Sequence, residues 1–498
     1  MSVVDDPSLP TTTAPDRAHR PSTRPSTVPR GTRPGRRADT RPSGLFRAFW
    51  RWHFYAAVVV VPVVLTLAVT GLVYLFRFQI EPMVHGDLMR VEHAPGQLLQ
   101  PYETQLEQVE AANPGATVVS MTEPKTADES TRFTIETAEG ATRDVFVDPY
   151  TVQVLGSLDP DSTISGTAVR IHADFMAGVV GDTVMELGVC WAIVMAITGY
   201  VMYFKGLKAR RRQRAAGAPS ANLRTTHARV GAVLGGGILL LVVSGLPWTG
   251  IWGAQTQKLA TSAGTSFWSE DHGALSNPTS TLDESLPHSH HVVPWAQEKT
   301  PVPGSTLPAD LTDGANDATV DTAVEVADRE GLAHPLTIAL PAEETGVYSA
   351  IGYAFDDPGQ ERTVHVDRFG GQVVSSYGYD QYPTLAKVVA QGISVHEGRR
   401  FGAVNMWLTT AFCIGVIVSC VTGPLMWWRR RHRGTGDVGA PRGRMPLATS
   451  PLLAVAVVAL AVFLPVFGAS LVVVLLLDRF VVSPNARLRR FVGSTART

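Results

Sequence analysis

The stretch TGYVMYFK at residues 198–205 returns as TGPLMWWR at residues 422–429. Both stretches end an apolar run that is long enough to form a helix. The repeat extends upstream, because His172 and His396 each lie 26 residues before their Thr-Gly pair. This agreement predicts that the second half of the chain copies the first.

A second pair of apolar runs repeats in the same way. His53 is followed 17 residues later by Thr70-Gly71, and His227 is followed 17 residues later by Ser244-Gly245. Each half therefore contributes two helices, and each helix has a histidine near its expected N-terminal end. The repeat predicts an α-helical integral membrane protein built as a pseudo-two-fold, duplicated four-helix bundle.

The apolar windows have the length that a membrane requires, which is about 20 residues. Uncharged windows cover residues 54–76, 184–204, 230–248 and 408–428. A fifth apolar element at residues 451–477 contains Pro465, so one kinked span and a short hairpin both remain open. Of the 498 residues, 45% are hydrophobic and only 17% are charged, which excludes an ordinary soluble multidomain protein.

Charges are segregated along the chain. Residues 1–52 hold ten Arg and four Asp, and residues 205–224 hold seven Lys or Arg and no acid. Residues 77–170 hold 15 acids and six bases, and residues 253–395 hold 19 acids and six bases. The positive-inside rule places the basic segments in the cytoplasm and the acidic segments outside it. The formal net charge of −1 excludes bulk attraction to nucleic acid.

Both acidic segments have the pattern of a small α+β domain. Residues 145–155 and 364–374 predict hairpins whose turns follow Asp148 and Asp367. A predicted helix (102–112 or 322–330) and a predicted strand (133–137 or 347–355) precede each hairpin. The expected order is a disordered basic cytoplasmic tail (1–49), first span (50–76), first outer domain (77–170), second span (171–204), basic cytoplasmic loop (205–226), third span (227–252), second outer domain (253–395), fourth span (396–428), cytoplasmic linker (429–450), apolar element (451–477) and tail (478–498).

The repeated histidines are the candidate cofactor-binding and metal-ligating residues. This topology puts His53 and His227 at the inner face and His172 and His396 at the outer face. Two imidazoles that approach from opposite helices can supply both axial ligands of a b-type haem, so we expect two bis-histidine haems. The alternative is four interfacial histidines at headgroup depth. One difficulty is that a continuous helix from His172 to Lys205 would be about 50 Å long, so that His172 would protrude beyond the membrane.

Weaker signals accompany these histidines. Gly178, Gly402 and the glycines at 235–237 have two possible roles, which are to make room for a haem or to let helices pack closely. Electron relay or packing both suit Trp191, Tyr200, Trp248 and Trp407. Glu397, Arg399 and Arg400 can either pair with haem propionates or solvate a helix end. His288, His290 and His291 can form either a surface loop or a transient metal site.

Six motifs resemble one known family. They are RWHFY (51–55), IHAD (171–174), THAR (226–229), SGLPWT (244–249), HEGRRFG (396–402) and TGPLMWWRR (422–430). Over about residues 50–428 the chain resembles the PepSY-associated transmembrane family of bacterial iron-regulated inner-membrane proteins. The resemblance implies PepSY-like outer domains in a multi-pass protein of the bacterial cytoplasmic membrane, with its N-terminus in the cytoplasm.

The same resemblance implies two functions of different class. Similar members include haem-containing reductases of ferric siderophores, which implies a reductase of Fe(III) chelates for iron acquisition, supplied by a cytoplasmic or quinol electron donor. The competing function is a membrane-anchored binding or regulatory protein, in which PepSY domains capture a peptide, sense a ligand or inhibit a peptidase without redox activity.

Overall fold

The computed structural model of the protein describes residues 44–217, 221–269, 280–286, 292–307, 317–430, 438 and 450–494. The predictions for residues 1–43, for His288, His290 and His291, and for most of the 429–450 linker lie outside these residues. Within the described part of the chain, apolar helices and an antiparallel sheet form one compact unit.

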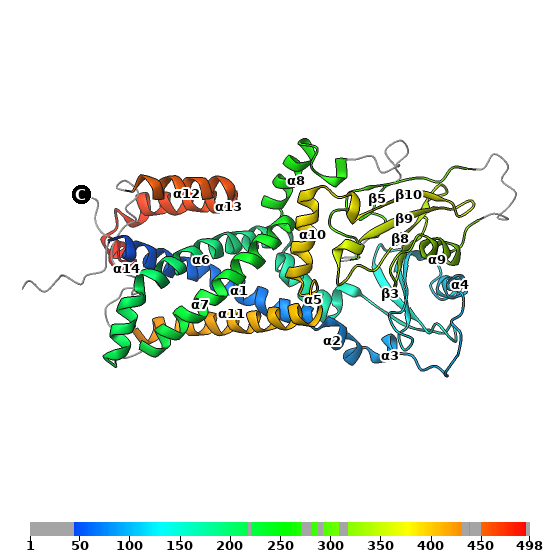
Figure 1. Ribbon diagram of the computed structural model, residues 1–498, viewed down its shortest axis with the longest axis horizontal. Coiled ribbons are helices and arrows are strands. Elements are labelled where there is room, and N and C mark those ends of the chain that lie inside the picture. Colours follow the sequence, from blue (N-terminus) through cyan, green and yellow to red (C-terminus); the bar gives the residue numbers. More distant parts are fainter. Residues whose placement is uncertain are drawn as a thin grey trace, which may run out of the picture. The chain divides into compact units, whose positions relative to one another are not determined.

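Five helices are long and apolar enough to cross a membrane: Leu45–Leu75, Gly178–Ala215, Ala221–Trp248, Gly402–Arg429 and Pro465–Val482. The first four belong to α1 (Gly44–Leu75), α6 (Gly178–Ala215), α7 (Ala221–Gly245, followed by η2, Leu246–Trp248) and α11 (Gly402–Arg430). These helices form a bundle in which α1 and α7 each pack against both α6 and α11 (Figure 1).

Two predicted boundaries at one end of this bundle are wrong. α1 begins at Gly44, so the predicted tail of residues 1–49 includes a helical turn. α6 continues to Ala215, so much of the predicted 205–226 loop is helix. Residues 205–215 are mainly Lys, Arg, Gln, Leu and Ala, which favour helix, and charge alone does not end a helix in water.

The predicted second and fourth spans are each broken into two helices. α5 (Ile164–Asp174) ends where Phe175 and Met176 adopt the left-handed conformation, with φ of 54° and 57°. α6 then begins at Gly178, and α5 packs against α1. The other half is broken between α10 (Thr384–His396) and α11, and α10 packs against α7.

These breaks correct the positions of two predicted site residues. His172 and His396 do not begin spanning helices, because they lie near the ends of α5 and α10. The expected 50 Å helix from His172 therefore does not exist. Gly178 and Gly402 have φ of 55° and 54°, and a Cβ on either would meet open space, so both serve the turn rather than clearance.

The two halves share a single sheet, although the repeat suggested two separate domains. Its strand order is β10-β9-β8-β7-β1-β2-β3-β4, and each neighbouring pair is antiparallel. The halves meet at a seam between β1 and β7, where Met121 lies opposite Ile338. The strands are β1 (Thr117–Thr122), β2 (Thr131–Glu136), β3 (Thr142–Val147), β4 (Val154–Leu158), β7 (Thr337–Ala339), β8 (Val347–Ile351), β9 (Arg362–Asp367) and β10 (Val373–Gly378).

Two helices of the sheet domain cap each other across the seam. α4 (Tyr102–Ala112) and α9 (Val320–Arg329) pack together and contact the sheet. The Asp321 carboxylate accepts hydrogen bonds from the backbone N–H groups of Tyr102 at 2.9 Å and Glu103 at 3.0 Å. The Glu103 carboxylate in turn accepts one from the N–H of Val320 at 3.1 Å. Because carboxylates stabilise helix N-termini, each half anchors a helix of the other.

His334 forms a pH-dependent contact at the same seam. Its Nδ1 lies 2.6 Å from Glu123 and its Nε2 lies 2.5 Å from Asp328. Burial lowers the pKa of His334, but the hydrogen bonds to Asp328 and Glu123 outweigh burial and the pKa is raised. The protonated ring therefore stabilises the fold below the unfolded pKa of about 6.5, and this stabilisation is lost as the pH rises through the higher folded pKa.

We expect the melting temperature to fall more steeply with pH in the wild type than in His334→Gln as the pH rises above about 6.5. Thermal unfolding followed by circular dichroism measures both slopes. His93→Gln is the control, because the His93 ring is exposed and hydrogen-bonds the Ala94 carbonyl. If the melting temperature falls equally steeply with pH in the wild type and in His334→Gln, protonation of His334 does not stabilise the fold.

The C-terminal apolar element is a hairpin, which is one of the two forms left open by the sequence. α12 (Pro451–Phe463) and α13 (Pro465–Leu477) pack against each other and are joined at Leu464 (Figure 1). The 13-residue α12 is about 20 Å long, too short to cross a hydrocarbon layer of about 30 Å. The remaining helices are α2 (Arg77–Val84), α3 (Gly86–Met89), α8 (Trp252–Ser262) and α14 (Ala486–Phe491), and β5 (Ser280–Thr281) pairs with β6 (Pro301–Val302).

Candidate functional site

His172 and His396 lie together, as their matching positions predict. Their ring centroids are 6.3 Å apart and the ring planes are 89° apart. Each metal–imidazole bond is about 2 Å long, so one metal ion fits between two rings at this separation. The distance between the two imidazoles therefore suits a pair of ligands on one metal ion.

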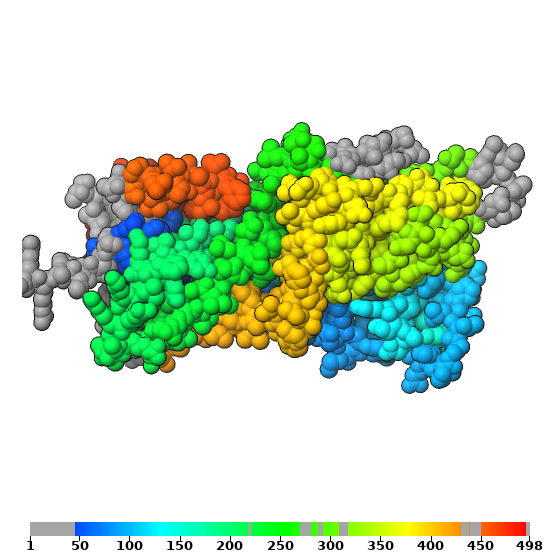
Figure 2. All heavy atoms as spheres, viewed as in Figure 1, coloured from blue at the N-terminus to red at the C-terminus, as the bar shows by residue number. Residues whose placement is uncertain are grey.

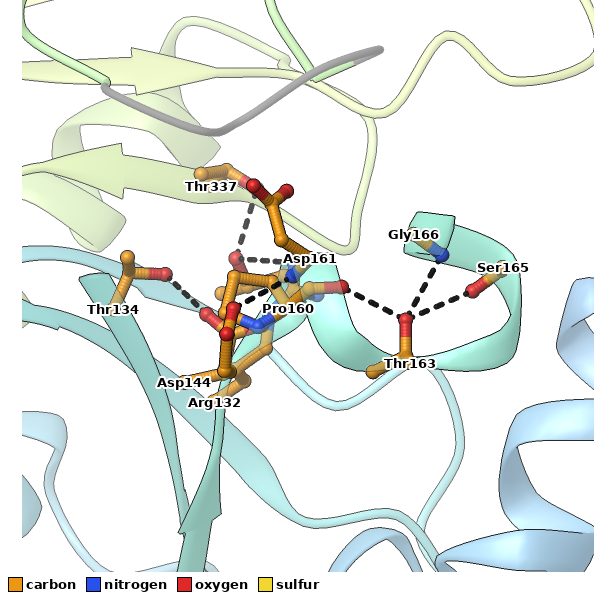
Figure 3. A network of polar contacts seen from close by, with 11 residues as sticks. Arg132, Thr134, Asp144, Pro160, Asp161, Thr163, Ser165, Gly166 and Thr337 are labelled. Atoms are coloured by element: carbon orange, nitrogen blue, oxygen red, sulfur yellow. Dashed lines mark hydrogen bonds and ion pairs between the residues drawn. The ribbon is translucent and has the colours of Figure 1, made fainter. Parts of the chain in front are cut away.

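The helix that carries His172 is firmly anchored at its other end. The Thr163 hydroxyl accepts a hydrogen bond from the N–H of Gly166 at 2.9 Å and donates one to the carbonyl of Pro160 at 2.8 Å (Figure 3). The buried Glu81 carboxylate accepts another from the N–H of Ser165 at 2.6 Å. These contacts satisfy the N-terminus of α5 and fix its direction, so His172 is held in place by the whole helix.

The partners of His172 decide which of its nitrogens carries the proton. Its Nδ1 lies 2.9 Å from the hydroxyl of Thr70 in α1. That hydroxyl already donates to the carbonyl of Thr66 at 2.8 Å, so it accepts from Nδ1–H. A neutral imidazole protonated at Nδ1 has its free electron pair on Nε2. The second nitrogen of His172 is therefore in the form that binds a metal ion.

His396 has the same arrangement on the other half of the bundle. Its Nδ1 lies 3.0 Å from the carbonyl of Leu241 and 3.1 Å from the hydroxyl of Ser244, both in α7. A carbonyl only accepts, so Nδ1 carries the proton and Nε2 has the electron pair. Thr70 and Ser244 are the residues that lie 17 positions after His53 and His227. The repeated spacing therefore places a hydroxyl beside His172 in one half and beside His396 in the other.

The second histidine pair lies at the opposite end of the bundle. His53 Nδ1 is 3.0 Å from the carbonyl of Met195 and 3.3 Å from the hydroxyl of Thr198, so the carbonyl again fixes the proton on Nδ1. The His53 ring also interacts electrostatically with His227. On α1, His53 and Thr70 are separated by 17 residues, or about 25 Å of helix. His53 and the pair His172–His396 therefore lie at different levels along the bundle.

Each of the four histidines faces a glycine on the helix paired with its own. The glycines are those of the repeated Thr-Gly and Ser-Gly pairs, and a larger residue would narrow the space beside the imidazole. A Cβ built on the glycine would lie 3.3 Å from Cε1 in the pair Gly199–His53, 3.8 Å in Gly71–His172, 3.9 Å in Gly423–His227 and 3.2 Å in Gly245–His396.

The run at residues 235–237 has a different use. A Cβ on Gly235 would lie 3.1 Å from the Tyr200 ring, and one on Gly237 would lie 2.4 Å from the Phe412 ring. These glycines allow aromatic side chains of neighbouring helices to pack closely. Their geometry favours the helix-packing interpretation over haem clearance.

The charged residues after His396 are occupied by protein partners. Arg399 forms an ion pair with Glu397 and donates a hydrogen bond to the Phe355 carbonyl at 2.5 Å. Arg400 donates to the Gln391 side chain and lies 3.4 Å from Asp357. Both arginines therefore fasten the α10–α11 connection, which favours the helix-end interpretation over propionate pairing.

Among the four aromatic residues considered for electron relay, Trp248 contacts a histidine of the site. Its ring centroid is 6.1 Å from that of His396. Trp191 instead donates a hydrogen bond to Ser470 of α13 at 3.0 Å, Tyr200 donates to the Ala232 carbonyl and Trp407 packs on Phe76. Packing is therefore the role that these three contacts support.

The sequence interpretation missed the hydroxyl partners Thr70, Thr198 and Ser244 as site residues. Their signal was present, because each is the first residue of a repeated Thr-Gly or Ser-Gly pair. Within the part of the chain that the structure describes, no group of three or more His, Cys, Asp or Glu is arranged to hold a metal ion. A pair of histidines is the ligand set of a metal that is held mainly by a macrocycle.

A comparison with curated proteins finds no match to this chain. The family model described as the PepSY-associated TM region matches residues 50–430, which include the bundle, both sheet halves and all four repeated histidines. The protein therefore belongs to the PepSY-associated transmembrane family.

Proposed function

We propose that this protein is a haem-containing electron-transfer protein of the bacterial cytoplasmic membrane that reduces Fe(III) chelates, such as ferric siderophores, on the outer side. The observation that carries the proposal is the pair His172–His396, with ring centroids 6.3 Å apart. The Nδ1 hydrogen bonds of both rings put the proton on Nδ1 and the electron pair on Nε2, the nitrogen that would coordinate a metal.

The proposal assigns His172 and His396 to an outer haem b and His53 and His227 to an inner one, in a bundle whose halves α1–α6 and α7–α11 are duplicates. A b-type haem with two imidazole ligands supplies a one-electron couple and has no open position for oxygen. At each site two histidines would hold and orient the haem. Thr70, the Leu241 carbonyl and the Met195 carbonyl keep the rings of His172, His396 and His53 in the coordinating tautomer.

The proposed topology places the sheet domain outside the cytoplasm. The segments that form it carry the large excess of acids, whereas the opposite end of α6 carries Lys205, Lys208 and four arginines between 210 and 214. The outer histidine pair then lies on the same side as the sheet domain, and the inner pair lies near the basic ends of the helices.

This placement suits the chemistry of iron release. Hard oxygen ligands of siderophores hold Fe(III) tightly, and Fe(II) is bound much more weakly by them. The outer pair places the donor end of the protein where an extracytoplasmic chelate arrives. The sheet domain covers that end, and it offers the surface on which a chelate can dock.

The proposal is tested on the full chain purified in detergent. We expect a b-type spectrum whose Soret band shifts when dithionite is added, a haem content of about two per chain, and Fe(II) release from a ferric siderophore by the dithionite-reduced protein after desalting. A colourless protein that still binds a peptide or another ligand through its sheet domain would instead favour the regulatory function.

The hydroxyl of Thr70 provides a sharper test of how the outer pair is set. Thr70→Val keeps the shape of the side chain but removes the acceptor of His172 Nδ1–H. We expect the outer site to bind haem about 10- to 100-fold more weakly, as is typical when the hydrogen bond behind a ligating histidine is lost. Haem titration of the depleted protein measures this affinity.

Thr66→Val is the matched control for this substitution. Thr66 lies one turn earlier on α1, and its hydroxyl donates to the Pro62 carbonyl rather than contacting the site. Unchanged affinity in Thr66→Val with weakened binding in Thr70→Val supports the role of the hydrogen bond. Equal affinities in both variants would contradict it.

A further inference from the structure

A wide cavity of about 690 Å³ opens beside the outer histidine pair. Its walls come from η2, α8, the turn at Phe267–Ser269 and the loop at residues 295–298. Figure 2 shows α8 as a projection beside the surface of α10. The volume lies within the range of about 300–1,000 Å³ that is usual for small-molecule sites.

Three indole rings and one amine give this cavity its chemical character. Trp248, Trp268 and Trp295 line it, and the Trp268 and Trp295 ring centroids are 5.9 Å apart. Lys258 supplies a positive charge from α8, and Glu298 also lines the cavity. Burial, followed by repulsion from Asp283, raises the pKa of Glu298 to about 7, although Lys299 opposes this, so Glu298 carries only part of a negative charge at neutral pH.

The cavity is joined to the proposed redox site through one side chain. Trp248 forms part of the cavity wall, and its ring centroid is 6.1 Å from that of His396. A ligand in the cavity would therefore be separated from the outer histidine pair by a single indole ring. This contact distinguishes the cavity from an ordinary apolar hollow on the surface.

From these observations we infer that the cavity is the docking site for Fe(III) chelates whose iron ligands are aromatic and anionic, such as catecholates. This inference rests on the proposed function and names its substrate class. Catecholate rings can pack against the indoles in offset or edge-to-face geometry, and Lys258 can pair with the anionic ligand oxygens. Chelates with aliphatic hydroxamate arms offer no ring to these indoles.

A lipid-soluble quinone suits the cavity less well. The third candidate span ends at Trp248, and the lining residues beyond it belong to α8 and to loops of the sheet domain. Lys258 is exposed, and Thr261 and Ser262 beside it are exposed as well. These exposed polar residues of the lining are in contact with water and suit a charged chelate.

The test uses a chelate that binds but cannot be reduced. The Ga(III) complex of 2,3-dihydroxybenzoate is titrated into the full chain in detergent, and bound gallium is counted after equilibrium dialysis. We expect Trp268→Ala and Trp295→Ala each to weaken binding about tenfold. Lys258→Gln is expected to weaken binding and to make it less sensitive to salt.

Matched variants at the other end of the bundle serve as controls. Trp428→Ala removes an exposed indole and Lys208→Gln removes an exposed amine, and neither is expected to change gallium binding. The Ga(III) complex of acetohydroxamate is expected to bind weakly in every variant. The inference is overturned if Trp268→Ala and Trp295→Ala bind like the wild type, if the hydroxamate complex binds as tightly as the catecholate, or if a short-chain quinone alone binds in a tryptophan-dependent way.

Haem content separates this inference from the proposed function. We expect Trp268→Ala to keep its Soret band while its gallium binding is weakened, and His396→Ala to keep gallium binding while it loses the outer haem. A haem-containing wild type that binds no gallium complex overturns the docking site alone. A haem-free wild type with tryptophan-dependent gallium binding supports the docking site, and the redox function then fails by itself.

Discussion

His172→Ala is expected to lower the haem content of the purified protein from about two per chain to about one and to stop Fe(III)-chelate reduction. The reason is that the substitution removes one of the two imidazoles whose ring centroids lie 6.3 Å apart. The haem that remains should keep the low-spin spectrum of a bis-histidine site, because His53 and His227 are unchanged. A pyridine haemochrome assay and the reduced spectrum measure both effects.

His93→Ala is the control for this variant. The His93 ring stacks on Tyr150 in the sheet domain, with ring centroids 4.9 Å apart, and it belongs to neither pair. We expect its haem content and reductase rate to equal those of the wild type. An unchanged spectrum and unchanged activity in His172→Ala would show that His172 and His396 do not bind haem.

Ile338→Lys is expected to unfold the sheet domain while the membrane helices stay folded. Ile338 and its partner Met121 are both fully buried at the seam between β1 and β7. A lysine ammonium without a partner in this core costs several kcal/mol, which approaches the whole stability of a typical domain. Limited proteolysis should then cut within residues 77–170 and 292–395, and circular dichroism should lose strand signal.

Val373→Lys provides the comparison on an outer strand of the same sheet. Val373 is 41% exposed in β10, so a lysine there can remain in water. We expect this variant to resist protease like the wild type. If Ile338→Lys resists protease equally well, the two halves are not held together by a common core.

The membrane helices could be predicted from the sequence because their signal is local. A run of about 20 apolar residues without charge has few other stable structures. Apart from Phe76, which follows the end of α1, the four uncharged windows lie within observed helices or the 3-10 extension of α7. The helix at Tyr102–Ala112 was also predicted at its observed boundaries. In these segments the residues that decide the structure are neighbours in the chain.

The helix breaks before α6 and α11 were missed because the predicted second and fourth spans were extended back to the repeated histidines His172 and His396. Phe175 and Met176 adopt the left-handed conformation although neither residue favours it, so tertiary packing of α5 on α1 must stabilise the turn. Gly178 and Gly402 were noticed as repeated residues. Their position six residues after each histidine would have indicated the break if it had been read as a helix end.

The shared sheet could not be predicted because hairpins do not reveal how sheet edges combine. The strand patterns at residues 145–155 and 364–374 identify hairpins within each half. The pairing of β1 with β7 joins residues more than 200 positions apart in the chain. The tryptophan cavity was missed for the same reason, since its walls come from four separate segments.

The candidate site was predictable where the repeat marked it. The four histidines were singled out as candidates because their spacing to Thr-Gly or Ser-Gly recurs, and the structure brings His172 beside His396. The tautomers were not predictable, because they depend on hydroxyl and carbonyl groups of a neighbouring helix. Those contacts place the proton on Nδ1, which leaves Nε2 as the nitrogen that would coordinate a metal.

The pairing of the four histidines is tested most directly by the haem content of two double variants. His172→Ala/His396→Ala removes both members of one proposed pair, whereas His53→Ala/His172→Ala removes one member of each. We expect about one haem per chain in the first variant and almost none in the second. Equal haem content in the two double variants would contradict this pairing.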